Sequence, residues 1–135
     1  MTNCVTEIKE ADVIFVTGSN TTENHPVMGM YIRQAKKAGK KLIVADPVRI
    51  PLAEIADVYL QINPGTSVAL SNGMIHVIFA EGLEDKEYIE KHTEGAAELR
   101  EFVKEYTPER VAEICGIDVE DLKKAARLYA TNRSY

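Results

Sequence analysis

Three short segments of the chain carry glycine, or side chains that can bind phosphates, ribose hydroxyls or bases. Each follows an apolar run: the first begins at Gly18, the second at Asp46 and the third at Asn63. Because ligands bind at the carboxyl ends of strands in an open parallel sheet, segments in these places can line one crevice. The candidate binding residues are Gly18, Ser19, Asn20, Glu23, His25, Asp46, Pro47, Arg49, Gly65, Thr66 and Ser67.

The three segments offer different chemistry. Gly18 lets the backbone turn tightly and come close to a ligand. Pro26 suits the first turn of a helix, whose free N–H groups favour a phosphate. Asp46 can accept hydrogen bonds from ribose hydroxyls, and the residues from Gly65 to Ser67 can donate to a second phosphate or a base. A turn glycine and an Asp-Pro turn would explain Gly18 and Asp46 singly, but the three segments together favour nucleotide binding. The first segment is not GxGxxG, so the dinucleotide site of an ordinary dehydrogenase is not supported.

The sequence shows no complete catalytic centre. Cys4 and Cys115 are far apart and make neither a disulfide framework nor a CxxC metal site. We expect His76 in the core and His92 on the surface, while His25 either touches a phosphate or caps a helix. No two histidines have metal-ligand spacing, and there is no Walker loop or GxSxG motif. We therefore predict no catalytic residue and no metal ligand, and leave enzyme activity open.

Length and charge narrow the class of protein further. The chain has 135 residues, 45% hydrophobic composition and a net charge of -5, as expected for one globular domain. The acidic surplus lies in residues 81–106, where a solvated helical surface is expected. This balance disfavours nucleic-acid binding. No apolar run approaches the roughly 18 residues of a membrane span. The absence of a signal peptide predicts a cytoplasmic location.

Strands and helices alternate in the first part of the chain. Continuous runs rich in β-branched residues predict buried parallel strands at 13–16, 41–45 and 58–62. Helical stretches follow these strands in turn, at 26–38, 52–55 and 66–80. The remainder is helical, with segments predicted at 86–91, 96–106, 107–115 and 118–130.

This order predicts the fold class. Parallel strands need crossover connections, which are almost always right-handed. We expect an α/β, Rossmann-like, three-layer αβα fold with a parallel sheet, followed by a helical C-terminal portion. The chain is interpreted as a single domain, residues 1–135. Residues 1–80 would form a nucleotide-cofactor-binding unit and residues 81–135 a helical portion packed on it.

Four segments in this order resemble the molybdopterin oxidoreductase family, and within it the catalytic alpha subunit of formate dehydrogenase. The resemblance covers essentially the whole chain, which would be an internal fragment of such a protein. The segments are ADVIFVTGSNTTENHPV, KLIVADPVRIPLAEIADVYLQI, INPGTSVAL and TPERVAEICGIDVEDLKKAARLYA.

The resemblance implies that the chain binds one of two molybdopterin guanine dinucleotides at the strand ends. Gly18, Asn20 and the loop to His25 would line the cofactor. Asp46 would hold the guanosine ribose, with Pro47 and Arg49 beside it, and Gly65 and Thr66 would approach the nucleotide end. Ser67 stands where the family often has an aspartate that pairs with guanine. Serine can make only one weaker contact there.

The resemblance also implies what lies elsewhere in a parent protein. The iron–sulfur cluster motif, the cysteine or selenocysteine that ligates molybdenum or tungsten, and a catalytic arginine have no counterpart in this sequence. The first hypothesis is therefore a cofactor-binding domain that is inactive as an isolated fragment. Its partners would be the rest of the catalytic subunit and electron-transfer subunits. The alternatives are a free-standing nucleotide-binding module, of NAD or CoA type, and a structural subunit that has lost its ligand.

Overall fold

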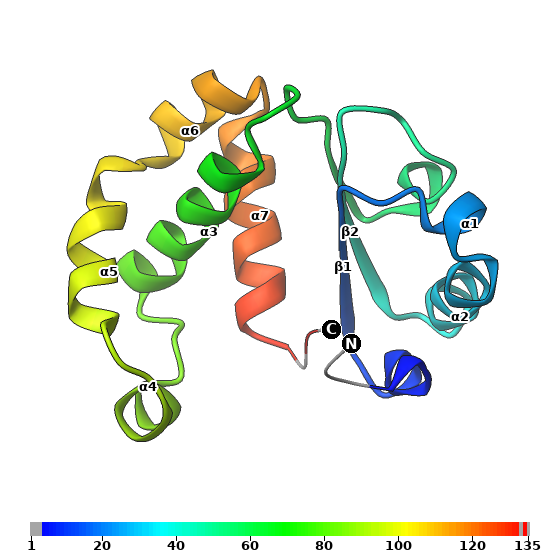
Figure 1. Cartoon of the computed structure of the whole chain (residues 1–135), viewed down its shortest axis with the longest axis horizontal. Helices are drawn as coiled ribbons and strands as arrows, with labels where there is room; N and C mark the ends of the chain where they lie inside the picture. The colour runs from blue at the N-terminus through cyan, green and yellow to red at the C-terminus, as the bar shows by residue number, and fades with distance from the viewer. Residues whose placement is uncertain (1–3, 133, 135) are drawn as a thin grey trace.

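The computed structural model describes residues 4–132 and 134, and its centre is a three-stranded parallel sheet (Figure 1). The strands are β1 (Val13–Thr17), β2 (Lys41–Ala45) and β3 (Val58–Leu60), in the spatial order β1-β2-β3. β3 ends two residues earlier than the sequence predicts. The N–H of Ile62 donates to the carbonyl of Leu60 at 3.0 Å, which turns the chain out of the sheet.

One face of the sheet is covered by the crossover elements and the N-terminal segment. The side chains of Ile14, Val16, Leu42 and Val44 form the sheet side of this core. Successive side chains of a strand point to opposite faces, so these alternate residues share one side. The covering elements are η1 (Val5–Lys9), α1 (Thr21–Asn24), α2 (Pro26–Lys37) and η2 (Ala53–Ile55).

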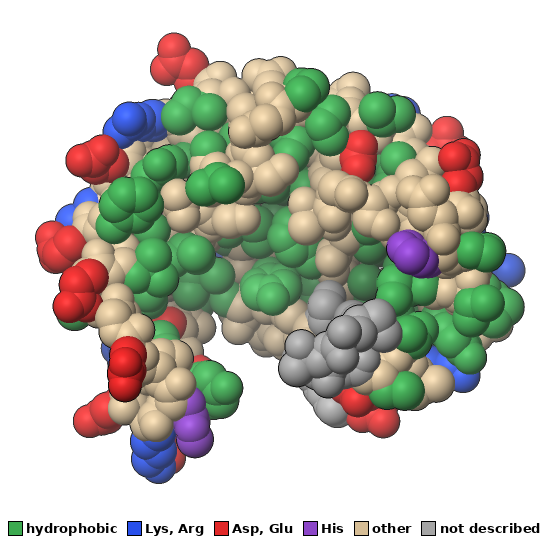
Figure 2. Space-filling model, in the orientation of Figure 1, with side chains coloured by type: hydrophobic (Ala, Val, Ile, Leu, Met, Phe, Trp, Pro, Cys, Tyr) green, Lys and Arg blue, Asp and Glu red, His purple; other side chains and the backbone are tan. Residues whose placement is uncertain are grey.

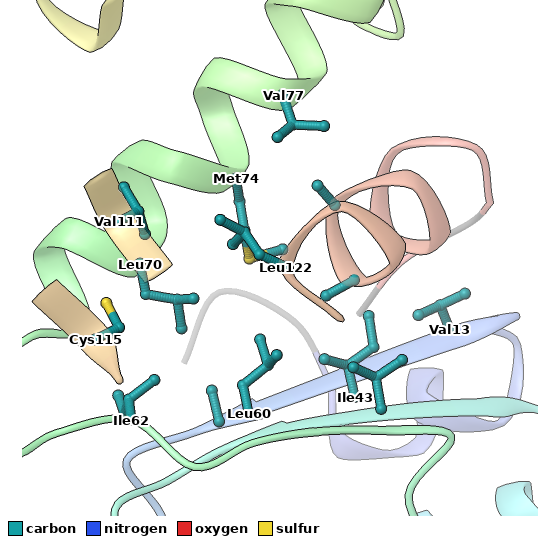
Figure 3. Packing of buried hydrophobic residues seen from close by; sticks show 14 residues of the cluster. Val13, Ile43, Leu60, Ile62, Leu70, Met74, Val77, Val111, Cys115 and Leu122 are labelled. Carbon is teal, nitrogen blue, oxygen red and sulfur yellow. The ribbon is translucent and has the colours of Figure 1, made fainter. Parts of the chain in front are cut away.

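The opposite face is covered by helices from the rest of the chain. Val13, Ile43 and Leu60 pack there against three helices (Figure 3). The expected three-layer αβα arrangement is confirmed, because helices cover both faces of the sheet. The three helices on this face are α3 (Ser67–Glu81), α6 (Pro108–Cys115) and α7 (Val119–Ala130).

Two short helices stand outside both cores, at the far left of Figure 1. Neither α4 (Lys86–His92) nor α5 (Ala96–Phe102) has a buried residue, and Figure 2 shows acidic side chains along this edge. After α5 the chain tightens into the 3-10 helix η3 (Val103–Glu105), so the helix predicted over 96–106 ends early. No helix in the described part of the chain is both long and apolar enough to cross a membrane.

The histidine predictions are borne out in part. His92 is exposed, as expected. His76 is half-buried rather than fully packed in the core, and its ring nitrogen Nδ1 lies 2.8 Å from the carbonyl oxygen of Val103. This polar contact gives a partner to a ring nitrogen that a purely apolar core would leave without one.

Candidate functional site

The hydrogen bonds of the sheet continue one residue past the strand ends and align three residues along its carboxyl edge. Thr17 lies opposite Ala45, and the N–H of Gly18 donates to the carbonyl of Ala45 at 3.2 Å. The N–H of Asp46 donates to the carbonyl of Leu60 at 3.2 Å. Gly18, Asp46 and Gln61 therefore follow three adjacent strands in a row, which we call the carboxyl-edge row.

Gly18 leaves its end of the row open. Its φ is +58°, a backbone conformation that favours glycine, and a Cβ built there would meet no atom within 4 Å. The next residues turn inward, and the hydroxyls of Ser19 and Thr21 lie 3.2 Å apart. Asn20 Oδ1 and Thr22 Oγ1 are buried, and no described group gives either atom a hydrogen bond. Buried polar atoms normally have a partner, so this loop has capacity for one more polar group.

Asp46 is buried, with 8% of its surface exposed. Its Oδ1 accepts a hydrogen bond from the N–H of Val48 at 2.8 Å, as in a turn that begins with aspartate. Its carbonyl accepts from the hydroxyl of Tyr59 at 3.2 Å. Among the described residues no donor reaches Oδ2, so turn formation leaves one carboxylate oxygen for a ligand hydroxyl.

Tyr59 and Gln61 belong to this site although the sequence reasoning did not select them. Besides its bond to Asp46, Tyr59 has its ring 6.0 Å from the guanidinium of Arg49. Burial and the Asp46 carboxylate raise the pKa of the Tyr59 phenol, while Arg49 acts in the other direction. Gln61 donates from Nε2 to the carbonyl of Pro47 at 3.2 Å. The available signal was their spacing of two within the predicted strand 58–62, which directs both side chains to the same face.

The third loop is held in place by the end of α6. The backbone N–H of Asn63 donates to the carbonyl of Cys115 at 2.7 Å, and its Nδ2 donates to the carbonyl of Ile114 at 3.1 Å. Gly116, with φ +73°, lies so close that an added Cβ would be 3.0 Å from Asn63 Nδ2. The helical part of the chain thus positions a loop of the candidate site.

This loop leads directly into α3. The hydroxyl of Thr66 donates to the carbonyl of Asn63 at 2.7 Å, and Thr66 gives the helix no side-chain cap. Gly65 has φ +83° and open space where a Cβ would be. Ser67 is exposed as the first residue of the helix. The N–H groups of a first helical turn have no partner within the helix and attract negative charge.

Two predicted site residues lie elsewhere. Glu23 and His25 are exposed, and no hydrogen bond of the described structure ties either to the carboxyl-edge row. His25 lines a groove of about 560 Å³ that also includes Val5 and Tyr31. The structure therefore groups Gly18 with Asp46, and Thr66 with the end of α6, but not His25 with either.

The described residues provide no metal centre of their own. No three histidine, cysteine, aspartate or glutamate side chains gather among residues 4–132 and 134. Burial raises the pKa of the Cys115 thiol, and its Sγ lies 3.7 Å from the carbonyl oxygen of Thr66. A thiol with a raised pKa is a weak ligand and nucleophile, so Cys115 acts in packing.

Fold and carboxyl-edge row together define a Rossmann-like α/β unit with polar loops at its strand ends. The chain belongs to the molybdopterin oxidoreductase family, whose model matches residues 1–131. It is 50% identical over 129 residues to F420-dependent formate dehydrogenase subunit alpha of Methanocaldococcus jannaschii, covering 96% of this chain and 19% of the relative. It is 41% identical over 134 residues to formate dehydrogenase H of Escherichia coli, and this match covers 99% of this chain and 19% of the relative.

A solved structure agrees with this assignment. Acetylene hydratase from Pelobacter acetylenicus matches with a TM-score of 0.84 and 42% sequence identity. The match covers 90% of this chain and 17% of that protein. The chain thus spans less than a fifth of the length of these relatives, which carry the names of different reactions.

Proposed function

We propose that this chain is the part of a formate-dehydrogenase-type oxidoreductase that binds the guanine nucleotide end of a molybdopterin guanine dinucleotide. The observation that carries the proposal is the carboxyl-edge row, with an open backbone at Gly18 beside a carboxylate at Asp46. A nucleotide needs both features, because its phosphates require close backbone approach and its ribose requires a hydrogen-bond acceptor.

The residues present fit such a group. The orphaned Oδ1 of Asn20 can accept from a hydroxyl or ring N–H, and the unused oxygen of Asp46 can accept from a ribose hydroxyl. The first turn of α3, beginning at Ser67, can donate to a phosphate or a base. When bound, the cofactor supplies two-electron chemistry at molybdenum or tungsten; these residues bind and orient its nucleotide end.

The chain alone would not catalyse the reaction of a parent enzyme. We propose that the metal ligand and the iron–sulfur cluster belong to other parts of the parent. We also propose that the parent enzyme passes electrons to electron-transfer subunits and that it is cytoplasmic. We expect no formate-dependent dye reduction by this chain, and weak nucleotide binding, because only part of the cofactor's surroundings is present.

Calorimetry with GMP and GDP tests the binding role of Asp46. We expect binding that Asp46→Asn weakens by about tenfold, which is the loss of one hydrogen bond to a charged acceptor. The matched control is Glu54→Gln, which neutralises an exposed carboxylate on η2. Equal heats for the wild type and Asp46→Asn would remove the ribose assignment. Tighter binding of NAD or CoA than of GDP would favour a different nucleotide module.

Guanine recognition gives a second, independent test at Ser67. An aspartate there can accept from two N–H groups of guanine, whereas a serine hydroxyl accepts weakly from one. We expect Ser67→Asp to increase the preference for GMP over AMP by about tenfold, with Ser67→Asn as the uncharged control. A change that is equal for both nucleotides would mean that the base lies elsewhere.

A further inference from the structure

A groove runs along α2 and contains none of the residues assigned above to nucleotide binding. Its volume of about 400 Å³ falls within the usual range of sites for small molecules. The groove is therefore a candidate site for a second ligand. Its lining includes Thr22 of α1 and Pro26, Gly29, Met30, Arg33 and Lys37 of α2.

The groove results from residue spacing on α2 and from one close contact with α1. Most of the lining residues of α2 are three or four positions apart, so they share one face of the helix. A Cβ at Gly29 would lie 3.1 Å from the Cα of Thr22 and 3.3 Å from the carbonyl oxygen of Thr21. Glycine at this position thus lets α1 pack directly against α2 (Figure 1), and Thr22 becomes part of the wall of the groove.

The groove carries positive charge that no described carboxylate neutralises. α2 contains no acidic residue. Three neighbouring lysines, Lys36, Lys40 and Lys41, have carboxylate partners at 2.6–3.2 Å. In the described part of the chain, neither Arg33 nor Lys37 has such a partner or a side-chain hydrogen bond. Because Arg33 is half-buried, an anion that paired with it would be shielded in part from water.

The remaining lining is mainly apolar and has one unused hydroxyl. Met30 is 46% exposed, and its unbranched side chain can adapt to an apolar group. Thr22 Oγ1 is buried, and no described group gives it a hydrogen bond. Threonine in a helix uses two χ1 rotamers, so this hydroxyl can turn toward the groove that Thr22 lines. The groove thus offers an anion site, an apolar surface and one further hydrogen bond.

We propose that this groove binds a small organic anion, a carboxylate or a phosphate ester, that has an apolar body. The guanidinium of Arg33 donates two parallel hydrogen bonds to the anionic group, and Lys37, one turn further along α2, adds a second positive charge. The apolar body lies on Met30, and the hydroxyl of Thr22 bonds to a polar atom of the ligand. Carboxylates and phosphates both present a pair of oxygens to a guanidinium, so the experiment compares the two.

NMR titration of residues 1–135 with hexanoate and with hexyl phosphate tests the proposal. Hexan-1-ol has the same apolar body without charge, while acetate and inorganic phosphate have the charge without the body. At about 150 mM salt, which screens exposed charges, we expect saturable shifts at Thr22, Gly29 and the Arg33 Nε–H. For at least one hexyl probe we expect a Kd of about 1 mM, tighter by about tenfold than for any of the three controls. The tighter of the two probes identifies the anionic group.

Variants of the groove separate a specific site from general attraction to a cation. We expect Arg33→Gln to weaken binding of the tighter probe by about tenfold, and Arg33→Lys, which keeps the charge but not the planar fork, by about threefold. Lys86→Gln removes a positive charge from an exposed position of α4 and should leave the Kd unchanged. Thr22→Val should weaken binding by about threefold, whereas Thr22→Ser should keep it.

Three results would overturn the proposal. One is the absence of saturable shifts with both hexyl probes at this salt concentration. Another is an equal loss of affinity in Arg33→Gln and Lys86→Gln, which would indicate attraction by net charge alone. The third is a set of shifts centred on Gly18 and Asp46, which would place the probe at the carboxyl-edge row. Nucleotide binding at that row is measured separately with GDP, so either proposal can fail without the other.

Discussion

Gly73 of α3 packs directly against Val111 of α6, and substituting Gly73 tests that packing. A Cβ at position 73 would lie 2.8 Å from both γ-methyl carbons of Val111 and 3.1 Å from its Cβ. Both residues are buried. Carbon atoms in good contact are about 3.5–4.0 Å apart, so a methyl group here overlaps by several tenths of an ångström. Rotating Val111 cannot relieve the contact, because its Cβ is too close as well.

Two opposing effects decide the sign for Gly73→Ala. Alanine stabilises a helix interior by about 1 kcal/mol relative to glycine. Overpacking a close-packed core costs about 1–3 kcal/mol and occasionally more. Since the overlap involves three atoms of Val111, we expect the upper part of this range and a net loss of about 1–2 kcal/mol in the free energy of unfolding.

Urea unfolding followed by circular dichroism measures this change. Ser71→Ala, at an exposed position of the same helix, is the control for helix propensity without overlap. The double variant Gly73→Ala/Val111→Ala gives the new methyl group space. We expect the double variant to lose at least about 1 kcal/mol less free energy of unfolding than the sum of the losses of the two single variants.

A stabilising effect of Gly73→Ala, or additivity in the double variant, would refute the close approach of the two helices. The result matters for the candidate site, because the end of α6 holds Asn63 through two hydrogen bonds. A displaced α6 would move the loop that leads into the first turn of α3.

Two further changes test other contacts. Asp57 accepts from Lys36 at 2.6 Å and from the N–H of Leu42 at 2.8 Å; burial acts to raise the pKa of its carboxyl, but these donors outweigh it and hold the pKa below its ordinary value. A carboxyl whose pKa is lowered on folding stabilises the fold at pH values above its unfolded-state pKa, and this stabilisation is lost as the pH falls. Asp57→Asn should therefore lower the free energy of unfolding by about 1–2 kcal/mol near pH 7 and by progressively less toward about pH 3, as measured by urea titrations. Gly116→Ala should cost about 1–2 kcal/mol through its positive φ and should shift the NMR signals of Asn63, whereas unchanged signals would contradict the tie between α6 and the third loop.

The regular elements could be predicted because their signals are local. β-branched runs identify the strands, and Pro108 and Gly116 bound α6 at the expected residues. Asp118 caps α7 by accepting from the N–H groups of Glu120 and Asp121. The short helices α1 and η1 were not predicted. Helices of four or five residues gain little from their own hydrogen bonds and depend on packing, here against α2.

The candidate site could be predicted only in part, for a related reason. Strand ends identify Gly18 and Asp46, since their place follows from local pattern and parallel topology. Gln61 joins them through the register of the sheet, and Asn63 is fixed by residues about fifty positions later in the chain. Contacts of that kind depend on tertiary packing that no short segment encodes. The grouping of His25 with Val5 rather than with Asp46 has the same origin.

The two cores of the sheet also differ in when they can form during synthesis. The buried members of the core on the α2 side all fall between Ile8 and Ala53, so this side can close once the first strands and their crossovers have been made. The other core joins Val13 to Ala126. A nascent chain therefore leaves the α3 side of its sheet incompletely covered until α7 has left the ribosome.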